Sequence, residues 1–215
     1  MPRQNRVTPF GDFQAVSAKG SMMGNRGILH DENGVLGSAR WRHLNWVACT
    51  LSFKGRKRTI MEPGHYTELF FCDEAVALAA GHRPCAECRR GDFRRFMSSW
   101  REAHGVPPSD PLKAPDVDRK LHAARVRRDK SQITFELTLG AVPEGAFIEL
   151  PNERGKAWLV WGDQIRLWSH EGYGEARQID PELTVNVLTP EPTVRVLAAG
   201  YKPTLHSTAT GGLTV

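Results

Sequence analysis

The stretch Gly81-His82-Arg83-Pro84-Cys85-Ala86-Glu87-Cys88-Arg89-Arg90 concentrates the chemistry of this 215-residue chain. Cys85 and Cys88 are separated by two residues in a turn that follows a proline, and this spacing lets both thiolates reach one tetrahedral ion. The arginines that flank the pair would offset the negative charge of a multi-thiolate metal centre. A redox Cys-x-x-Cys pair is expected within a β-α-β unit, and the sequence shows no such unit. The stretch therefore predicts one half of a zinc site.

Two more ligands would complete a tetrahedral zinc site. Cys49 is the candidate third ligand, although its place on the apolar side of a predicted strand is also typical of a core residue. His30 is the candidate fourth ligand, because a neutral imidazole often replaces a thiolate and the neighbouring Asp31 could orient the ring. Cys72 and His65 are alternatives. The predicted ligands of Zn²⁺ are thus Cys49, Cys85, Cys88 and His30.

Short strands and one short helix are predicted before the turn. Alternating apolar side chains over residues 44–53 predict a strand, and residues 58–61 return as a second strand after a basic hairpin tip. Residues 66–71 predict a third strand. Asp73-Glu74 places acids in the first turn of a short helix, where the helix dipole favours them, and Gly81 suits the C-terminal end of that helix.

A longer helix and a β-rich region are predicted after the turn. Large apolar side chains at helical spacing predict an amphipathic helix from Asp92 to about His104. Four prolines within residues 105–115 predict a linker, and a basic helix follows over residues 116–128. The rest of the chain predicts strands at 132–139, 146–150, 156–161, 164–168 and 183–188, and a short helix at 192–199.

These elements predict the α+β fold class, with a small zinc-stabilised N-terminal α/β module followed by a β-rich C-terminal region. Residues 1–104 are the predicted zinc-binding, basic domain, and residues 105–115 are the linker. Residues 116–208 are the predicted β-rich domain with its leading basic helix, and residues 209–215 are a loose tail.

The composition is typical of a soluble globular protein, with 40% apolar and 25% charged residues. Four cysteines are too few for a disulfide scaffold of this length. The N-terminal residues lack the apolar stretch of a signal peptide, and no apolar run approaches the length of a membrane span. We therefore expect a cytoplasmic protein that does not contact a membrane.

Basic residues are concentrated in the first part of the chain. Residues 1–130 contain 23 Lys and Arg against 14 Asp and Glu, whereas residues 131–215 contain 6 against 10. This asymmetry predicts that the first part contacts a polyanion such as nucleic acid. The candidate phosphate-contacting residues are Lys54, Arg56, Lys57, Arg58, Arg83, Arg89, Arg90, Arg125 and Arg128.

Residues 66–90 resemble the metal-binding module of Ada-type DNA repair proteins. The resemblance is carried by Phe70-Phe71-Cys72-Asp73-Glu74-Ala75 and by Ala80-Gly81-His82-Arg83-Pro84-Cys85-Ala86-Glu87-Cys88-Arg89. In that family a strand ending in aromatic residues leads to a short helix and then to an Arg-Pro-Cys-x-x-Cys-Arg turn. The resemblance implies zinc, contact with the DNA backbone and methyl transfer from DNA phosphotriesters to a zinc-bound cysteine. The family's Cys-x-x-x-Cys pair before the strand has only Cys49 as a counterpart here.

Three functional hypotheses follow, and they leave open whether the protein is an enzyme. The first is a zinc-containing DNA-binding protein in DNA repair, with DNA favoured over RNA as the partner. The second is a nucleic-acid-processing enzyme, either a nuclease or a glycosylase/lyase, that uses His30 and Asp31 or the amine of Pro2. The third is a structural-zinc interaction module whose C-terminal half binds a protein partner. Trp158, Trp161, Trp168 and Tyr173 lie in that half and are expected to be core residues rather than docking residues.

Overall fold

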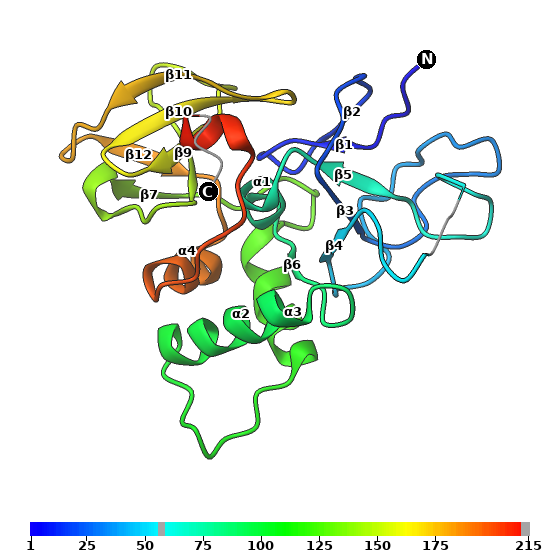
Figure 1. Ribbon diagram of the computed structural model, residues 1–215, viewed down its shortest axis with the longest axis horizontal. Helices are drawn as coiled ribbons and strands as arrows, with labels where there is room; N and C mark the ends of the chain where they lie inside the picture. The colour runs from blue at the N-terminus through cyan, green and yellow to red at the C-terminus, as the bar shows by residue number, and fades with distance from the viewer. Residues whose placement is uncertain (56–58, 212–215) are drawn as a thin grey trace.

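The computed structural model describes residues 1–55 and 59–211, and it confirms the α+β class. Its described part contains four α-helices and two six-stranded sheets. Figure 1 shows the first sheet on the right, the second on the left, helix α1 between them and the other three helices below. The predicted phosphate-contacting residues Arg56, Lys57 and Arg58 lie outside the described residues.

The first sheet combines antiparallel and parallel pairing, with the strand order β2-β1-β5-β3-β4-β6. β3 pairs antiparallel with β4 and β5, whereas the β1–β5 and β4–β6 pairs are parallel. The β4–β6 pair matters most for the site, because it aligns Ala48 with Pro84, directly before the Cys-x-x-Cys turn. The strands are β1 (Arg6–Val7), β2 (Phe13–Gln14), β3 (Met22–Asn25), β4 (Val47–Thr50), β5 (Leu69–Phe71) and β6 (Arg83–Pro84).

The second sheet is antiparallel throughout, with the order β11-β10-β9-β8-β12-β7. Five of its strands lie within the predicted ranges or extend them by one residue. The sixth, β11, was not predicted, because its sequence Gly-Tyr-Gly-Glu-Ala-Arg-Gln has no apolar alternation. The strands are β7 (Phe135–Thr138), β8 (Phe147–Glu149), β9 (Trp158–Trp161), β10 (Gln164–Ser169), β11 (Gly172–Gln178) and β12 (Thr184–Val187).

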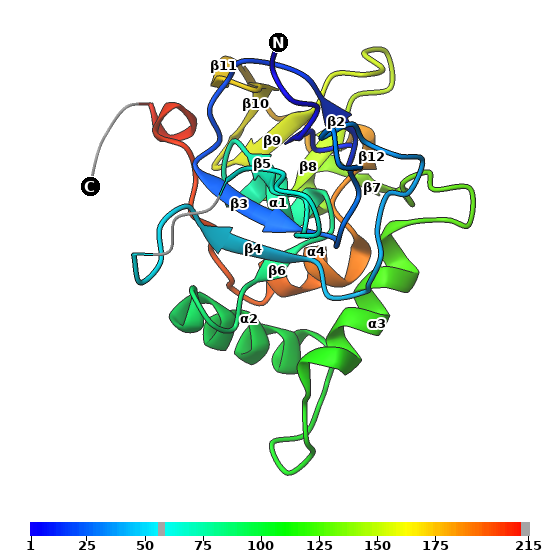
Figure 2. The ribbon, with the colours of Figure 1, turned by 90° about the vertical axis from the view of Figure 1, so that its right-hand side faces the viewer.

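The four helices differ in burial because their sequences differ in polarity. They are α1 (Glu74–Ala79), α2 (Arg90–Ala103), α3 (Ala114–Arg125) and α4 (Glu191–Ala198). All six residues of α1 are buried, and Gly81 closes this helix with a φ of 84°, as predicted. α2 buries Phe96 and Trp100 along its apolar stripe and packs against α4, as Figure 2 shows, and it begins at Arg90 rather than at Asp92.

The hydrophobic cores do not follow the predicted boundary between residues 104 and 116. One cluster joins Leu69 and Phe71 to Phe147 and Leu159, and the other joins residues of α1 and α2 to Trp158 and strands of the second sheet. The two halves of the chain therefore share both cores. The aromatic residues of the C-terminal half are core residues as expected: Trp158 and Tyr173 are buried, and Trp161 and Trp168 pack on the first cluster.

The predicted loose tail, residues 209–215, is partly wrong. Residues Ser207–Thr210 form a 3₁₀ turn that packs against β11, and Ala209 is fully buried in the first core cluster. The small, polar composition of this segment predicted a loose tail, but burial of Ala209 anchors residues 207–210 against β11. Residues 212–215 lie outside the described part of the chain.

Asp73, which directly precedes α1, connects this helix to the C-terminal half. Its Oδ1 accepts a hydrogen bond from the backbone N–H of Val76 (3.0 Å) and so caps the helix. Its Oδ2 accepts from the hydroxyl of Tyr173 (2.8 Å) and from the backbone N–H of His206 (3.0 Å). Burial raises the pKa of this carboxyl, and the hydrogen bonds oppose that shift.

Glu74, the next residue, makes a second set of buried contacts to the same half. Its Oε1 accepts from the hydroxyl of Tyr201 (2.6 Å), and its Oε2 accepts from the backbone N–H of Thr204 (2.8 Å) and from Arg89 (2.8 Å). Both members of the Glu74–Arg89 ion pair are almost fully buried. Arg89 directly follows Cys88, so this pair also fixes the end of the Cys-x-x-Cys turn.

Replacing Glu74 by Gln is expected to lower the free energy of unfolding by about 3 kcal/mol, because the amide N–H₂ would face donors and leave Arg89 short of a buried counter-charge. Urea denaturation measures this. The matched control is Glu191→Gln, which breaks an exposed ion pair with Arg195 and should change stability by less than about 0.5 kcal/mol. Equal stability of the two variants would contradict the assignment.

Candidate metal centre

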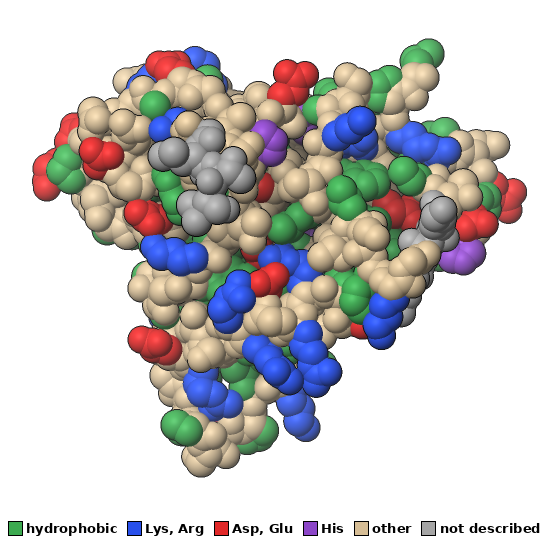
Figure 3. All heavy atoms as spheres, in the orientation of Figure 1, with side chains coloured by type: hydrophobic (Ala, Val, Ile, Leu, Met, Phe, Trp, Pro, Cys, Tyr) green, Lys and Arg blue, Asp and Glu red, His purple; other side chains and the backbone are tan. Residues whose placement is uncertain are grey.

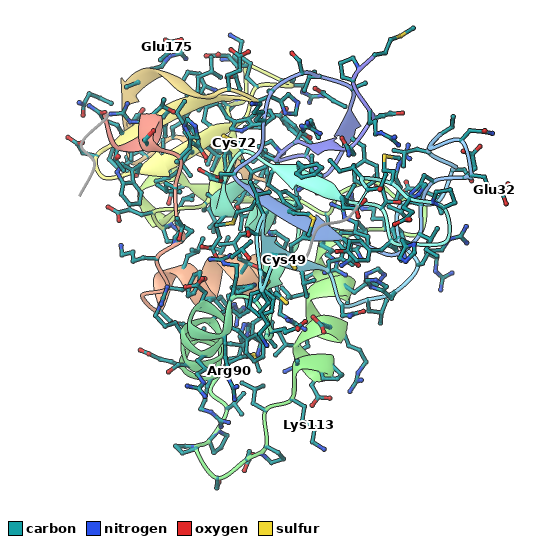
Figure 4. All side chains as sticks on the ribbon, turned by 45° about the vertical axis from the view of Figure 1, so that its right-hand side comes forward. Glu32, Cys49, Cys72, Arg90, Lys113 and Glu175 are labelled. Carbon is teal, nitrogen blue, oxygen red and sulfur yellow. The ribbon has the colours of Figure 1, made fainter. Side chains whose placement is uncertain are left out.

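The pairing of β4 with β6 brings Cys49 beside the Cys-x-x-Cys turn. Arg83 donates its backbone N–H to the carbonyl of Trp46 (3.1 Å), and Cys85 donates to the carbonyl of Ala48 (2.9 Å). These two bonds continue a parallel ladder past the end of β6, so that Cys85 lies alongside Cys49. Figure 4 shows Cys49 at the centre of the molecule, on β4.

Three cysteine sulfurs converge at this point. The Sγ atoms of Cys49, Cys85 and Cys88 all lie within 4.8 Å of one another, and the three residues are half-buried. Around a tetrahedral ion with metal–sulfur bonds of about 2.3 Å, the sulfurs would be about 3.8 Å apart. The three side chains therefore fit a thiolate metal centre with small adjustments, as the sequence predicted for these three residues.

The three thiols differ in pKa, which is lowered at Cys85 and raised at Cys49 and Cys88. Hydrogen bonding from the Cys49 thiol, together with backbone N–H groups of Glu87 and Cys88, lowers the pKa of Cys85 to about 5. The same Cys49–Cys85 hydrogen bond, followed by burial, raises the pKa of Cys49, and burial raises the pKa of Cys88. One thiolate is thus present at neutral pH, and it is held among two neutral thiols.

The structure does not bring the predicted fourth ligand, His30, to this group. The His30 ring is buried, and its Nδ1 lies 2.6 Å from Oγ1 of Thr67 and its Nε2 lies 3.4 Å from the carbonyl of Glu62. The neighbouring Asp31 caps its own turn by accepting from the N–H groups of Asn33 and Val35. His30 is therefore hydrogen-bonded to a distant segment of the chain, and Asp31 is used within its own turn.

The two alternative ligands also lie elsewhere. Cys72 is buried at the end of β5, and Figure 4 shows it well apart from Cys49. His65 is exposed and lies near Glu62 and the carbonyl of Pro63. Within residues 1–55 and 59–211, no further His, Cys, Asp or Glu side chain belongs to the three-cysteine group. A fourth ligand position is thus left to another group.

A pocket of about 670 Å³ lies against the three cysteines, which form part of its wall. The rest of the lining is mostly apolar and includes Leu51, Ile60 and Phe70, the first two of which are large apolar residues exposed to solvent. The sequence predicts these side chains to lie on strands, because alternation alone does not separate a pocket wall from a core. An occupant of this pocket would have direct access to an ion held by the cysteines.

Two of the predicted phosphate-contacting arginines are ion-paired inside the protein. Arg83 donates Nε and Nη2 to the two carboxylate oxygens of Asp118 (2.8 Å each), and both side chains are buried. Arg89 pairs with Glu74 (2.8 Å) and Asp92 (2.6 Å). Neither arginine is thus free to face a ligand, because these carboxylates take up its charge, and two of them, Glu74 and Asp118, lie 15 and 35 positions away in the sequence.

Arg125 is also buried, because the guanidinium stacks on the ring of Trp46. Lys54, Arg90 and Arg128 are exposed, as a phosphate contact requires. Figure 3 shows Lys and Arg side chains gathered over the lower part of the molecule, where α2 lies. The exposed basic residues of α2 and α3, together with Lys113 directly before α3, are here called the basic helix surface. They are Arg90, Arg94, Arg95, Lys113, Arg119 and Lys120.

No helix within the described ranges is both long enough and apolar enough to cross a bilayer. The chain matches none of the protein-family models, curated proteins or solved structures with which it was compared. Function is therefore inferred from the geometry and chemistry of the site.

Replacing Cys85 by Ser is expected to abolish metal binding, because two sulfurs and a hydroxyl bind a soft ion far more weakly than three thiolates. Elemental analysis of protein purified without chelators should fall from about one metal equivalent to near zero. Cys72→Ser is the matched control, since Cys72 lies outside the group, and it should keep its metal. Metal retained in the Cys85 variant would contradict the assignment.

Metal affinity is expected to fall as the pH falls. Cys85, with its pKa lowered to about 5, is already ionised at pH 7, whereas the raised pKa values of Cys49 and Cys88 keep those thiols protonated. Binding should therefore release about two protons, and the apparent affinity should drop about a hundredfold per pH unit between about pH 6 and pH 8. Competition with a chromophoric chelator measures this, and an affinity independent of pH would exclude thiolate ligation.

Proposed function

We propose that this protein is a zinc-containing DNA-binding protein that acts in DNA repair. The observation that carries the proposal is the convergence of Cys49, Cys85 and Cys88 from two segments of the chain. Thiolate-rich, tetrahedral sites favour zinc among the common divalent ions. The resemblance of residues 66–90 to the Ada-type module supports the same ion and the same process.

The zinc ion would stabilise the turn that precedes α2. Two of its ligands lie in this turn and the third lies on β4, so the ion would cross-link the first sheet to the start of the helix. α2 begins at Arg90, two residues after Cys88, and its exposed side carries Arg94 and Arg95. Binding of the ion would therefore fix the orientation of these arginines.

The basic helix surface is the proposed contact with the phosphate backbone. Arg94, Lys113 and Lys120 on this surface make no ion pair with any of the described residues, whereas Arg95 and Arg119 pair with acidic residues of their own helices. Lys and Arg side chains that neutralise phosphates release counterions, which gives affinity without reading the base sequence. DNA is the proposed polyanion because of the resemblance, since positive charge alone does not distinguish DNA from RNA.

A nucleic-acid-processing enzyme is the second candidate, and the pocket beside the cysteines favours it. Three protein ligands with a further position open to a pocket are typical of catalytic zinc sites. His30 and Asp31 do not support a separate catalytic pair, because both already make hydrogen bonds with other residues of the protein, His30 with Thr67 and Asp31 within its own turn. The exposed Pro2 remains a candidate amine nucleophile, and borohydride trapping on abasic DNA, with Pro2→Ala as the control, tests it.

The protein-interaction hypothesis has less support. The aromatic side chains of the C-terminal half that could have formed a docking surface are packed in the cores. A partner bound there would have to use the polar surface of the second sheet. Pull-down that persists at high salt would favour this hypothesis over nucleic-acid binding.

Binding to duplex DNA is expected to weaken steeply as salt rises, since each neutralised phosphate contributes about −0.9 to the slope of log K against log salt. Replacing Arg94 and Lys120 together by Gln should lower affinity and make the slope shallower by about two such units. Fluorescence anisotropy of a labelled duplex measures both quantities.

The control for this measurement is Lys156→Gln, which removes one exposed charge from the segment before β9, where Lys156 pairs with Glu153. It should leave the affinity and the slope unchanged. A flat salt response of the unaltered protein would contradict DNA-backbone binding, and an equal loss in the control would assign the effect to net charge alone.

A further inference from the structure

Two buried arginines stack on one buried tryptophan. Trp46 is 1% exposed, and the guanidinium carbons of Arg26 and Arg125 lie 3.8 Å and 3.6 Å from the centroid of its ring system. Both arginines are themselves only 2% exposed. Cation–π contacts stabilise each guanidinium, but they do not neutralise its charge. The protein therefore holds two positive charges close together in its interior.

Neither arginine has a carboxylate partner among the described residues. Arg26 donates Nε to Nε2 of His82 (3.3 Å) and Nη2 to the carbonyl of Ala80 (3.2 Å). His82 must be neutral to accept this bond, and burial followed by the charge of Arg26 lowers its pKa well below the ordinary value. The bonds of Arg26 thus go to neutral acceptors, and the carboxylate of Asp12 offsets its charge only from beyond ion-pair distance.

Arg125 is bound in the same way. It donates Nη1 to the carbonyl of Gly81 (2.6 Å) and Nη2 to the carbonyl of Leu44 (2.8 Å). Its buried Nε has no hydrogen-bond partner within the described part of the chain. Gly81 is required here, because a Cβ at this position would collide with the Arg125 side chain. The fold therefore accommodates this guanidinium specifically while it leaves one of its donors unused.

Burial makes this arrangement costly in the absence of a ligand. Burial lowers the pKa of Arg26 to about 9 and that of Arg125 well below its ordinary value, and the positive charge of Arg26 adds to the shift at Arg125. Buried charges without a partner are uncommon in proteins, because the lost hydration is not replaced. An anion placed between these groups would offset that cost.

A cavity of about 380 Å³ lies against both arginines. Two further cations, Arg40 and Lys130, line it nearer the surface, and two carboxylates, Asp12 and Glu149, line it as well. Both oxygens of Glu149 already accept hydrogen bonds, from the Gly155 N–H and from Asn186. The lining of the cavity thus contains four cationic side chains and two carboxylates, and Glu149, one of the two carboxylates, is already hydrogen-bonded to Gly155 and Asn186.

The side-chain amide of Gln132 links three segments of the chain around this cavity. The Nε2 of Gln132 lies within hydrogen-bond distance of the carbonyls of Pro9 (3.0 Å), Ala79 (3.2 Å) and Leu188 (2.9 Å), which belong to three separate segments. The cavity is therefore a defined part of the fold. It shares no lining residue with the pocket beside the cysteines.

We propose that this cavity, here called the Trp46 pocket, binds a phosphate ester. Guanidinium groups match the oxygens of a phosphate, and Arg26 and Arg125 retain N–H donors that the protein does not use. The volume lies within the range of small-molecule sites and exceeds that of a lone phosphate ion. The ligand is a free mononucleotide-sized phosphate ester or the terminal phosphate of a nucleic-acid strand, which present the same chemistry. The site is independent of the metal centre and of the basic helix surface.

Thermal unfolding of the full chain tests this inference, with inorganic phosphate, a nucleoside 5′-monophosphate, and one oligonucleotide with and without a 5′-phosphate as probes. Ionic strength is held constant with sodium chloride. A phosphate ester near saturation should raise Tm by about 5 °C, since ligands that bind only the folded state stabilise it. A response to the mononucleotide identifies a small ligand, and a response only to the 5′-phosphorylated strand identifies a strand end.

Variants at the surface end of the pocket keep the test independent of folding. Arg40→Gln removes a half-exposed charge, and Lys130→Asn removes an exposed one while it suits the positive φ of 73° at that position. Each should weaken phosphate-ester binding about tenfold, as expected for the loss of one charge-assisted contact. Lys19→Gln, an exposed residue outside the pocket, is the control and should leave binding unchanged.

Three outcomes would overturn the proposal. The first is no Tm shift with any phosphate probe beyond that of chloride. The second is an equal shift with succinate, which would show that the pocket does not select phosphate. The third is a shift that persists unchanged in both pocket variants.

Discussion

Two adjacent buried carboxylates, at Asp73 and Glu74, determine how the two sheets of this protein meet. Together they accept hydrogen bonds from Tyr173, Tyr201, Thr204 and His206 of the C-terminal half, and Glu74 also pairs with Arg89 beside the metal-binding turn. Buried carboxylates are costly unless every oxygen is satisfied, so this arrangement tolerates little displacement of any partner. The position of the cysteine turn is therefore coupled to the docking of the second sheet.

The parts of the fold that sequence could predict are those specified by local signals. The Cys-x-x-Cys spacing, the glycine that ends α1 and the apolar stripe of α2 each depend on residues within a few positions of one another. Pairing between distant segments was not predictable in this way. The parallel β4–β6 pair and the Arg83–Asp118 ion pair join residues 35 or more positions apart, and the charge of an arginine does not reveal where its partner lies. This is why Cys49 could be proposed as a ligand, whereas His30 was misassigned and Arg83 and Arg89 were expected to face a ligand although they are ion-paired inside the protein.

The strand β4 separates the two candidate sites. Val47 and Cys49 face the pocket beside the metal-binding cysteines, whereas Trp46, immediately before the strand, lies in the wall of the arginine-lined cavity. Side chains of a strand alternate between its two sides, so a short segment of sequence contributes to both sites. The two cavities therefore lie on opposite sides of one strand and share no lining residue.

The order in which the chain is synthesised gives the contacts of Asp73 and Glu74 a further consequence. Their partners Tyr201, Thr204 and His206 lie 127 to 133 positions further along the chain, and Ala209 fills a place in the core of the first sheet. A nascent chain that still lacks these residues leaves the buried carboxylates with only some of their donors, such as Val76 and Arg89, and leaves the first core incomplete. Unlike proteins whose N-terminal domain folds while translation continues, this one can complete its N-terminal half only after residues 201–209 have emerged from the ribosome.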